Sequence, residues 1–175
     1  MCRIAYIIDS MRNFAGNAKK SKHSFLLDDA LQNALTLAGN KIKKIKIIQD
    51  IDKSSMVFGS KINIIQVFLN LFINASDALE NINRTPEIKI STYEKNNRLF
   101  ITMKDNGVGI EKSDISNIFD PFFTTKDIGK GMGFGLSICY KIIKDHGEIL
   151  KVDSKKEEWT HFSFSLPVSH SSDVF

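Results

Sequence analysis

The feature that most constrains the fold of this chain is a long glycine-bearing segment, residues 105–135, which joins an alternating apolar pattern to a helical one. Apolar residues stand between the glycines of its last part, 129–135, and this argues against a merely flexible linker. A segment of this length exceeds an ordinary connection, and long loops in compact domains usually cover a binding site. We therefore expect a folded domain with this segment as a lid.

The hydrophobic patterns around the segment predict helices and strands in alternation. Helical spacing is found in residues 3–15, 28–37, 61–83 and up to about residue 145. Strand patterns are found in residues 44–51, 88–92, 99–103, 148–153 and 160–167, with a hairpin turn at 95–97. This order predicts an α/β (α+β) two-layer sandwich with helices packed on one face of a mixed sheet.

The composition restricts the class of protein. The 175 residues are 42% hydrophobic and 25% charged, as in globular domains. Because Gln66 and Asn70 interrupt the apolar run Ile64–Ile73, that run is too short and too polar to span a membrane. The net charge of +4 comes from scattered lysines without a zinc-finger or RNA-binding motif, so no nucleic-acid partner is expected. Cys2 and Cys139 lack metal-site spacing, and a reducing cytoplasm is the expected location.

Three polar residues share one face of the predicted helix 61–83. Asn70, Asn74 and Asp77 stand at positions i, i+4 and i+7 among apolar neighbours, so this face borders the interior or a pocket. Buried amides cost free energy unless they are hydrogen-bonded. One asparagine could cap a neighbouring loop, but a second amide and an acid on the same face favour a ligand site. An amide oxygen suits Mg²⁺ where phosphates supply the negative charge.

Two parts of the glycine-bearing segment fit other chemical groups. Asp105, at a predicted strand end, can accept a hydrogen bond from an exocyclic amine, and the glycines two and four residues later let backbone approach a flat ring. Asp-Asn-Gly is also an ordinary turn. Residues 129–135 open a helix, so their N–H groups and the helix dipole form an anion site suited to phosphates, with Lys126 and Lys130 adding charge.

Together these segments resemble, in order, the motifs of the histidine kinase catalytic domain in the GHKL, or Bergerat-fold, ATPase superfamily. Asn70–Ala78 resembles the asparagine box, Asp105–Ile110 the first glycine box, Ile118–Lys126 the phenylalanine box and Gly131–Ser137 the second glycine box. The likeness covers about residues 25–168 and ends in a closing strand at Thr160. It implies a Bergerat fold whose glycine-rich segment is an ATP lid.

The resemblance implies a role for each matched residue. Asn70 and Asn74 would be catalytic, with Asn74 coordinating Mg²⁺ that bridges the triphosphate. Asp105 would bond the adenine amine, with Thr160 helping to fix the base. Asp77 stands where many relatives carry a basic residue. The implied nucleotide-binding residues are Asn74, Asp77, Ala78, Asp105, Gly107, Gly109, Ile110, Thr125, Lys126, Lys130, Gly131, Met132, Gly133, Phe134, Gly135, Leu136 and Thr160.

The resemblance also implies a domain organisation and partners. Residues 1–16 would be the end of the second dimerisation helix, 17–27 a linker, 28–168 the catalytic ATP-binding domain and 169–175 a tail. The expected partners are ATP, the dimerisation domain of the parent kinase, which carries the phosphoacceptor, and through it a response regulator. A homodimer through the apolar stripe of residues 3–15 is a further expectation.

The residue at position 70 favours phosphoryl transfer over hydrolysis. ATP-hydrolysing members of the superfamily place a glutamate there as the base for water, whereas the amide of Asn70 cannot take a proton near neutral pH. In the family an acidic residue follows the acceptor histidine. None of His23, His146, His161 and His170 is followed by one, so the acceptor is expected on a separate domain. The alternatives are an ATPase without kinase activity and a nucleotide-sensing module without catalysis. Weak or absent ATP binding would favour the module.

Overall fold

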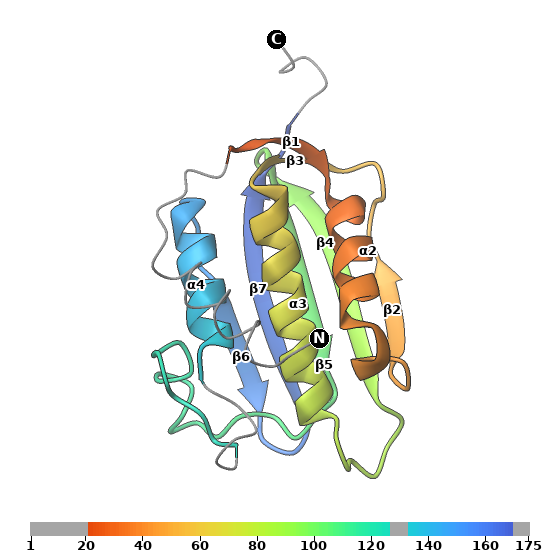
Figure 1. Ribbon diagram of the computed structural model, residues 1–175, viewed down its shortest axis with the longest axis vertical. Coiled ribbons are helices and arrows are strands. Elements are labelled where there is room, and N and C mark those ends of the chain that lie inside the picture. The colour runs from red at the N-terminus through yellow and green to blue at the C-terminus, as the bar shows by residue number, and fades with distance from the viewer. Residues whose placement is uncertain (1–20, 127–132, 170–175) are drawn as a thin grey trace.

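The computed structural model describes residues 21–126 and 133–169, which fold into a mixed five-stranded sheet with three helices on one face (Figure 1). The strands in spatial order are β2 (Lys46–Asp50), β4 (Glu87–Lys95), β5 (Arg98–Asp105), β7 (Trp159–Pro167) and β6 (Lys151–Lys155). β2 runs parallel to β4, and every other neighbouring pair is antiparallel. The predicted two-layer sandwich with a mixed sheet is confirmed.

The helix layer consists of α2 (Leu27–Ala38), α3 (Lys61–Ala78) and α4 (Gly135–Asp145), with a short 3₁₀ turn at Gly39–Lys41. Figure 1 shows α3 between the other two helices, over the middle of the sheet. The apolar residues of α3 recur at helical spacing, so one side of the helix packs on the strands. The largest fully buried side chains are Phe68, Phe72, Leu27, Leu31, Ile64, Leu71, Ile88, Ile90, Leu99, Ile101, Ile143 and Leu150.

The β4–β5 hairpin sets the register of the sheet up to the end of β5 at Asp105. Asn96 and Asn97 form the predicted turn with φ values of 53° and 57°, a left-handed conformation that asparagine tolerates better than most residues. The pairing that starts at this turn continues to the far end of β5, where Asp105 lies opposite Thr160 of β7. Two predicted site residues from distant parts of the sequence thus become neighbours.

A second, two-stranded sheet is formed by β1 (His23–Leu26) and β3 (Met56–Gly59), which pair antiparallel. Neither strand was predicted from the sequence, because four residues are too few to show a clear alternation. The prediction of a linker over 17–27 is therefore wrong at its end, since Phe25 and Leu27 are buried in the core. Ser169, placed in the tail, also belongs to the fold, because its N–H donates to the carbonyl of Met56.

The helix predicted over residues 61–83 ends earlier, at Ala78. Asn81 adopts a left-handed conformation (φ 65°), and the carbonyl of Ala78 accepts a hydrogen bond from the N–H of Val108. The chain after Ala78 therefore turns toward the end of β5 instead of continuing as helix. The predicted helix 3–15 and the residues after 169 lie outside the described part of the chain. Within that part, none of the helices combines the length and apolar character that crossing a membrane requires.

His146 attaches the start of α3 to the end of α4. Its Nε2 accepts the N–H of Ser60 at 3.0 Å, and its Nδ1 lies 2.7 Å from the carbonyl oxygen of Ile142. Because that carbonyl can only accept, Nδ1 carries the hydrogen, Nε2 has a free lone pair and the ring is neutral. Burial is the main reason that the pKa of His146 is lowered from its ordinary value of 6.5.

We predict that His146→Gln makes the free energy of unfolding less dependent on pH. A histidine whose pKa is lowered by folding contributes its full stability above pH 6.5 and loses it as the pH falls through the folded-state pKa. Glutamine keeps an acceptor for Ser60 but does not titrate. Urea unfolding from about pH 7.5 to about pH 5.5 should therefore show a smaller loss of stability in the variant than in the wild type. Equal losses would contradict this assignment.

Candidate functional site

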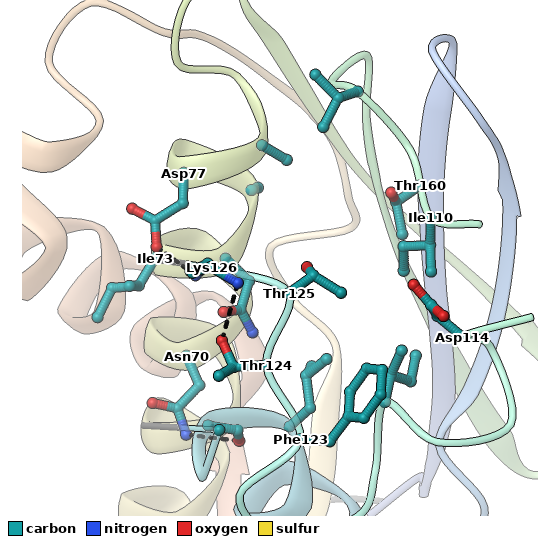
Figure 2. Close-up of a pocket in the computed structure, with 18 of the residues that line it drawn as sticks. Asn70, Ile73, Asp77, Ile110, Asp114, Phe123, Thr124, Thr125, Lys126 and Thr160 are labelled. Atoms are coloured by element: carbon teal, nitrogen blue, oxygen red, sulfur yellow. Dashed lines mark hydrogen bonds and ion pairs between the residues drawn. The ribbon is translucent and has the colours of Figure 1, made fainter. Parts of the chain in front are cut away.

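A pocket of about 880 Å³ opens between the second half of α3, the start of α4 and the strand ends at Asp105 and Thr160. Figure 2 shows Asn70 and Asp77 on one wall, Ile110, Asp114 and Thr160 on the opposite wall, and the segment Thr124–Lys126 between them. The predicted site residues that line it are Asn70, Asn74, Asp77, Ala78, Asp105, Gly109, Ile110, Thr125, Lys126, Gly133, Phe134, Gly135, Leu136 and Thr160.

Four predicted site residues remain, of which one, Gly107, is described and is not among those that line the pocket. Gly107 lies directly behind the wall, where an added Cβ would stand 2.7 Å from both the carbonyl oxygen of Ala78 and Oδ1 of Asp105. Such distances leave no room for a side chain, so glycine is required here. The other three, Lys130, Gly131 and Met132, lie outside the described residues.

Asp105 supplies a buried carboxyl group at one end of the pocket. Its side chain is 5% exposed, and its Oδ1 accepts the N–H of Gly107 at 2.9 Å. Burial raises the pKa of Asp105 to about 6, while backbone hydrogen bonds from Gly107 and Thr160 oppose that rise. Near neutral pH the group is therefore mostly an ionised acceptor in a site that excludes much of the water.

Backbone and hydroxyl groups complete this end of the pocket. Gly109 has a φ of 66° and lies so close to β6 that an added Cβ would be 2.2 Å from the carbonyl oxygen of Lys155. The hydroxyl of Ser154 accepts the N–H of Ile110 at 2.9 Å and lies 3.3 Å from the hydroxyl of Thr160. These contacts hold a flat backbone surface beside the carboxyl group of Asp105.

Two asparagines of α3 form the opposite end of the pocket. Asn70 is 2% exposed, and its Nδ2 donates to the carbonyl oxygen of Gly135 at 3.2 Å, which ties α3 to the first residue of α4. The Nδ2 of Asn74 is buried without a hydrogen-bond partner within the described chain. Since orphaned buried polar atoms are rare and costly, this amide is suited to bind a group that enters the pocket.

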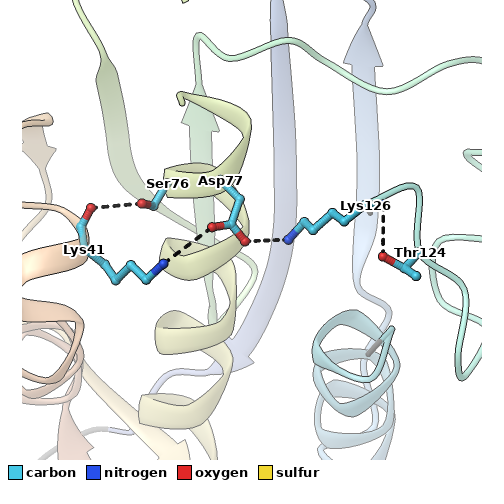
Figure 3. A network of polar contacts seen from close by, with 5 residues as sticks. All are labelled: Lys41, Ser76, Asp77, Thr124 and Lys126. Atoms are coloured by element: carbon cyan, nitrogen blue, oxygen red, sulfur yellow. Dashed lines mark hydrogen bonds and ion pairs between the residues drawn. The ribbon is translucent and has the colours of Figure 1, made fainter. Parts of the chain in front are cut away.

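A charged network is centred on Asp77, which lines the pocket (Figure 3). Asp77 Oδ2 contacts Lys126 Nζ at 2.5 Å, and its Oδ1 lies 3.9 Å from Lys41 Nζ. The N–H of Lys126 donates to the hydroxyl of Thr124 at 3.2 Å. The ion pair with Asp77 therefore connects the end of the phenylalanine-rich stretch, Ile118–Lys126, to α3, across the mouth of the pocket.

The phenylalanine-rich stretch packs against a glycine of the following segment. The N–H of Phe122 donates to the carbonyl oxygen of Gly133 at 3.1 Å. Gly133 has a φ of 70°, and an added Cβ would be 2.4 Å from the carbonyl carbon of Phe122 and 2.6 Å from the oxygen of Phe123. Only glycine fits this contact, which brings the two segments together on one side of the pocket.

Several residues that line the pocket were not predicted from the sequence. They are Ile73, Ala75, Val108, Glu111, Asp114, Ile118, Phe123, Thr124, Ile138, Lys156 and Phe162. Ile118, Phe123 and Thr124 lie within the stretch that resembles the phenylalanine box, so that resemblance was a usable signal. Lys156 gave none, because it reaches the pocket through the turn between β6 and β7.

The arrangement suits a ligand with an amine-bearing flat ring at one end and an anionic group at the other. Asp105 can accept from the amine, and Lys126 can neutralise part of the anion. Within residues 21–126 and 133–169, no three His, Cys, Asp or Glu side chains gather closely enough to hold a metal ion by themselves. A half-turn of the Asn74 amide exchanges its nitrogen and oxygen, so this residue can offer one oxygen to a cation whose other ligands come from phosphates and water.

Comparison with known proteins agrees with this geometry. Residues 59–170 match the family described as histidine kinase-, DNA gyrase B- and HSP90-like ATPase. The sensor protein FixL of Bradyrhizobium diazoefficiens is 32% identical over 172 residues, which cover 95% of this chain and 33% of FixL. The sensory histidine kinase/phosphatase NtrB of Azospirillum brasilense is 31% identical, over 95% of this chain and 44% of NtrB.

A solved structure of similar fold is the catalytic domain of the histidine kinase ThkA, with a TM-score of 0.70 and 28% identity over 84% of this chain and 95% of that domain. The chain thus spans a third to under a half of these two curated relatives but nearly the whole of a separate catalytic domain. It has the GHKL, or Bergerat, fold of such domains. The chain therefore belongs to the histidine kinase-, DNA gyrase B- and HSP90-like ATPase family, and within it is similar to the ATP-binding catalytic domains of sensor histidine kinases.

Proposed function

We propose that this chain binds Mg-ATP and transfers its γ-phosphoryl group to a histidine on a separate dimerisation domain, as the catalytic domain of a sensor histidine kinase in two-component signal transduction. The observation that carries the proposal is that one pocket has a buried carboxyl group, Asp105, at one end and the buried Asn74 Nδ2, without a hydrogen-bond partner among the described residues, at the other. ATP has an amine-bearing base and a metal-bound triphosphate at its two ends.

Asp105 would recognise adenine. Its carboxylate accepts a hydrogen bond from the amine of adenine, whereas the carbonyl group at the same position of guanine can only accept and would face it unpaired. Gly109 and Ile110 provide the backbone surface for the face of the ring, and Thr160 lies opposite Asp105 in the strand register. Exclusion of water from this end strengthens the charge-assisted hydrogen bond.

Asn74 would hold the metal ion, and the start of α4 would bind the phosphates. Mg²⁺ neutralises phosphate charge and takes few protein ligands, which fits one amide oxygen. Gly135 and Leu136 begin α4 beside the pocket, so the positive end of the helix dipole faces the anion. Lys126 lines the pocket, and a phosphate would compete for it with Asp77.

Asn70 supports transfer to a protein acceptor over hydrolysis. Its amide donates to the carbonyl oxygen of Gly135 and cannot act as a general base for water. Residue 70 would therefore organise the junction of α3 and α4 while the acceptor histidine supplies the nucleophile. His23 on β1 and His161 on β7 are not among the residues that line the pocket, and neither is His146 at the end of α4.

The partners would be the dimerisation domain that bears the acceptor histidine and, through that domain, a response regulator. Within the proposal the domain acts on the cytoplasmic side, and residues 3–15 would pack in a helical bundle with the dimerisation domain or with a second copy. The alternative function, a nucleotide-sensing module or an ATPase without kinase activity, makes different predictions for phosphoryl transfer.

We predict that the purified chain binds ATP without labelling itself. Transfer needs the acceptor nitrogen in line with the γ-phosphate, and positioning provides most of the catalysis. With radiolabelled ATP, the chain alone should stay unlabelled and release phosphate slowly. Adding the dimerisation domain of the same kinase as a separate polypeptide should yield acid-labile phosphohistidine on that partner. Fast phosphate release, or no transfer despite ATP binding, would support the alternative function.

We predict that Asn74→Ala removes the effect of Mg²⁺ on nucleotide affinity. Wild-type protein should bind ATP more tightly with Mg²⁺ than with EDTA, whereas the variant should lose roughly tenfold or more in the presence of the metal. Alanine keeps helix propensity, so circular dichroism should be unchanged. Asn33→Ala, which truncates an exposed asparagine on α2, is the matched control and should bind like wild type. Equal Mg²⁺ dependence in all three proteins would refute the metal role.

We predict that Asp105→Asn weakens ATP binding by about 10- to 100-fold, the usual worth of a hydrogen bond to a charged group, and reduces the preference for ATP over GTP. Because the pKa of Asp105 is about 6, wild-type affinity should be constant well above that pH and fall as the carboxylate is protonated below it. Asparagine does not titrate. The ratio of wild-type to variant ATP affinity, measured by calorimetry at each pH, therefore reports protonation of Asp105, because protonation of the nucleotide affects both proteins equally. A ratio independent of pH would count against this role.

A further inference from the structure

Arg84, in the connection between α3 and β4, joins two segments that are far apart in the sequence. Its Nε donates to the carbonyl oxygen of Asn106 at 2.7 Å. Its Nη2 lies 2.8 Å from the carbonyl oxygens of both Gly107 and Glu157, and 3.2 Å from that of Glu158. One exposed side chain thus contacts four backbone carbonyl groups.

These contacts require the shape of an arginine. Nη2 carries two hydrogens, so two of its three acceptors share one hydrogen, while Nε serves the fourth acceptor from a different position. A lysine keeps the positive charge, but its ammonium is one point at the end of a flexible chain and cannot reproduce the fork. Charge and geometry at position 84 can therefore be separated by substitution.

The two segments that Arg84 joins form the end of the pocket that contains Asp105. The N–H of Gly107 donates to Oδ1 of Asp105. The next residue, Val108, lines the pocket, and its carbonyl accepts the N–H of Glu157 at 2.6 Å. Lys156, beside Glu157 in the turn between β6 and β7, lines the pocket too. A shift of either segment would therefore move the walls around the carboxyl group.

Arg84 also acts through its charge. The guanidinium group favours the ionised form of Asp105 and lowers its pKa, although burial remains the larger influence and raises it. Substitution by lysine should largely keep this electrostatic effect, whereas substitution by glutamine should remove it.

We propose that Arg84, which does not itself line the pocket, is a positioning residue that fixes the two segments around Asp105 and so sets the affinity of the site for the adenine base. The proposal rests on the proposed ATP-binding function. It assigns to Arg84 no contact with the nucleotide and no effect on the phosphate end of the pocket.

The test compares Arg84→Lys and Arg84→Gln with wild type and with the control Arg98→Gln. Arg98 pairs with the carboxylate of Glu148 and donates to Ser165, and it lies at the opposite end of β5, about 23 Å from Asp105 at the usual rise per residue. Both Arg84 variants should bind Mg-ATP about tenfold more weakly than wild type. Their affinity for Mg-tripolyphosphate, which lacks the base, should be unchanged when it is measured by competition. Arg98→Gln should lower the melting temperature without changing either affinity.

The pH profile separates the two contributions of Arg84. In Arg84→Gln the fall of ATP affinity at low pH should begin at a higher pH than in wild type, whereas Arg84→Lys should keep the wild-type midpoint. Wild-type affinities in both Arg84 variants would overturn the positioning role, as would an equal loss in Arg98→Gln or an equal loss of tripolyphosphate binding. If wild type binds no adenine nucleotide at all, the proposed function itself fails, so the two failures are distinguishable.

Discussion

The structure depends on the burial of α3, which serves at once as the centre of the core and as one wall of the pocket. Phe68 and Phe72 are fully buried, with Phe68 against Phe164 of β7, and stabilisation from such apolar burial offsets the cost of placing amides beside them. Asn70 meets that cost with a hydrogen bond to the start of α4. The Nδ2 of Asn74 is buried without a hydrogen-bond partner among the described residues, and an unsatisfied group that borders a pocket is typical of a site that is completed by a ligand.

The other wall depends on close approaches of backbone that only glycine allows. Gly107 fits behind Asp105, Gly109 against β6 and Gly133 against the phenylalanine-rich stretch, each with no room for a Cβ. Besides conformational freedom, these glycines allow close packing that brings backbone groups within reach of a ligand. Arg84 adds a side chain that bonds the neighbouring carbonyl groups from outside the pocket, so the geometry around Asp105 is fixed from both sides.

Opposite charges meet where Asp77 and Lys126 line the pocket. Asp77 and Lys126 form an ion pair that is partly exposed, and such pairs contribute little net stability because solvent screens them. A triphosphate brings several negative charges to the same place, where it would attract Lys126 and repel Asp77. Breaking the ion pair to bind a phosphate therefore costs little free energy. The negative charge of Asp77 weakens the electrostatic attraction of the site for phosphates.

The sequence by itself determined the order of the motifs, the mixed sheet with helices on one face, and most of the residues that line the pocket. The sheet and its helices follow from hydrophobic periodicity, which a linear pattern preserves. The motif order and most of the pocket residues follow from the resemblance of those motifs to a known family. Tertiary structure alone decided the rest: the short strands β1 and β3, the early end of α3, the pairing of Asp77 with Lys126, and the four contacts of Arg84. Each of these depends on residues distant in the chain, and no pattern along the sequence encodes which distant carbonyl group or charge a side chain will meet once the sheet register is set.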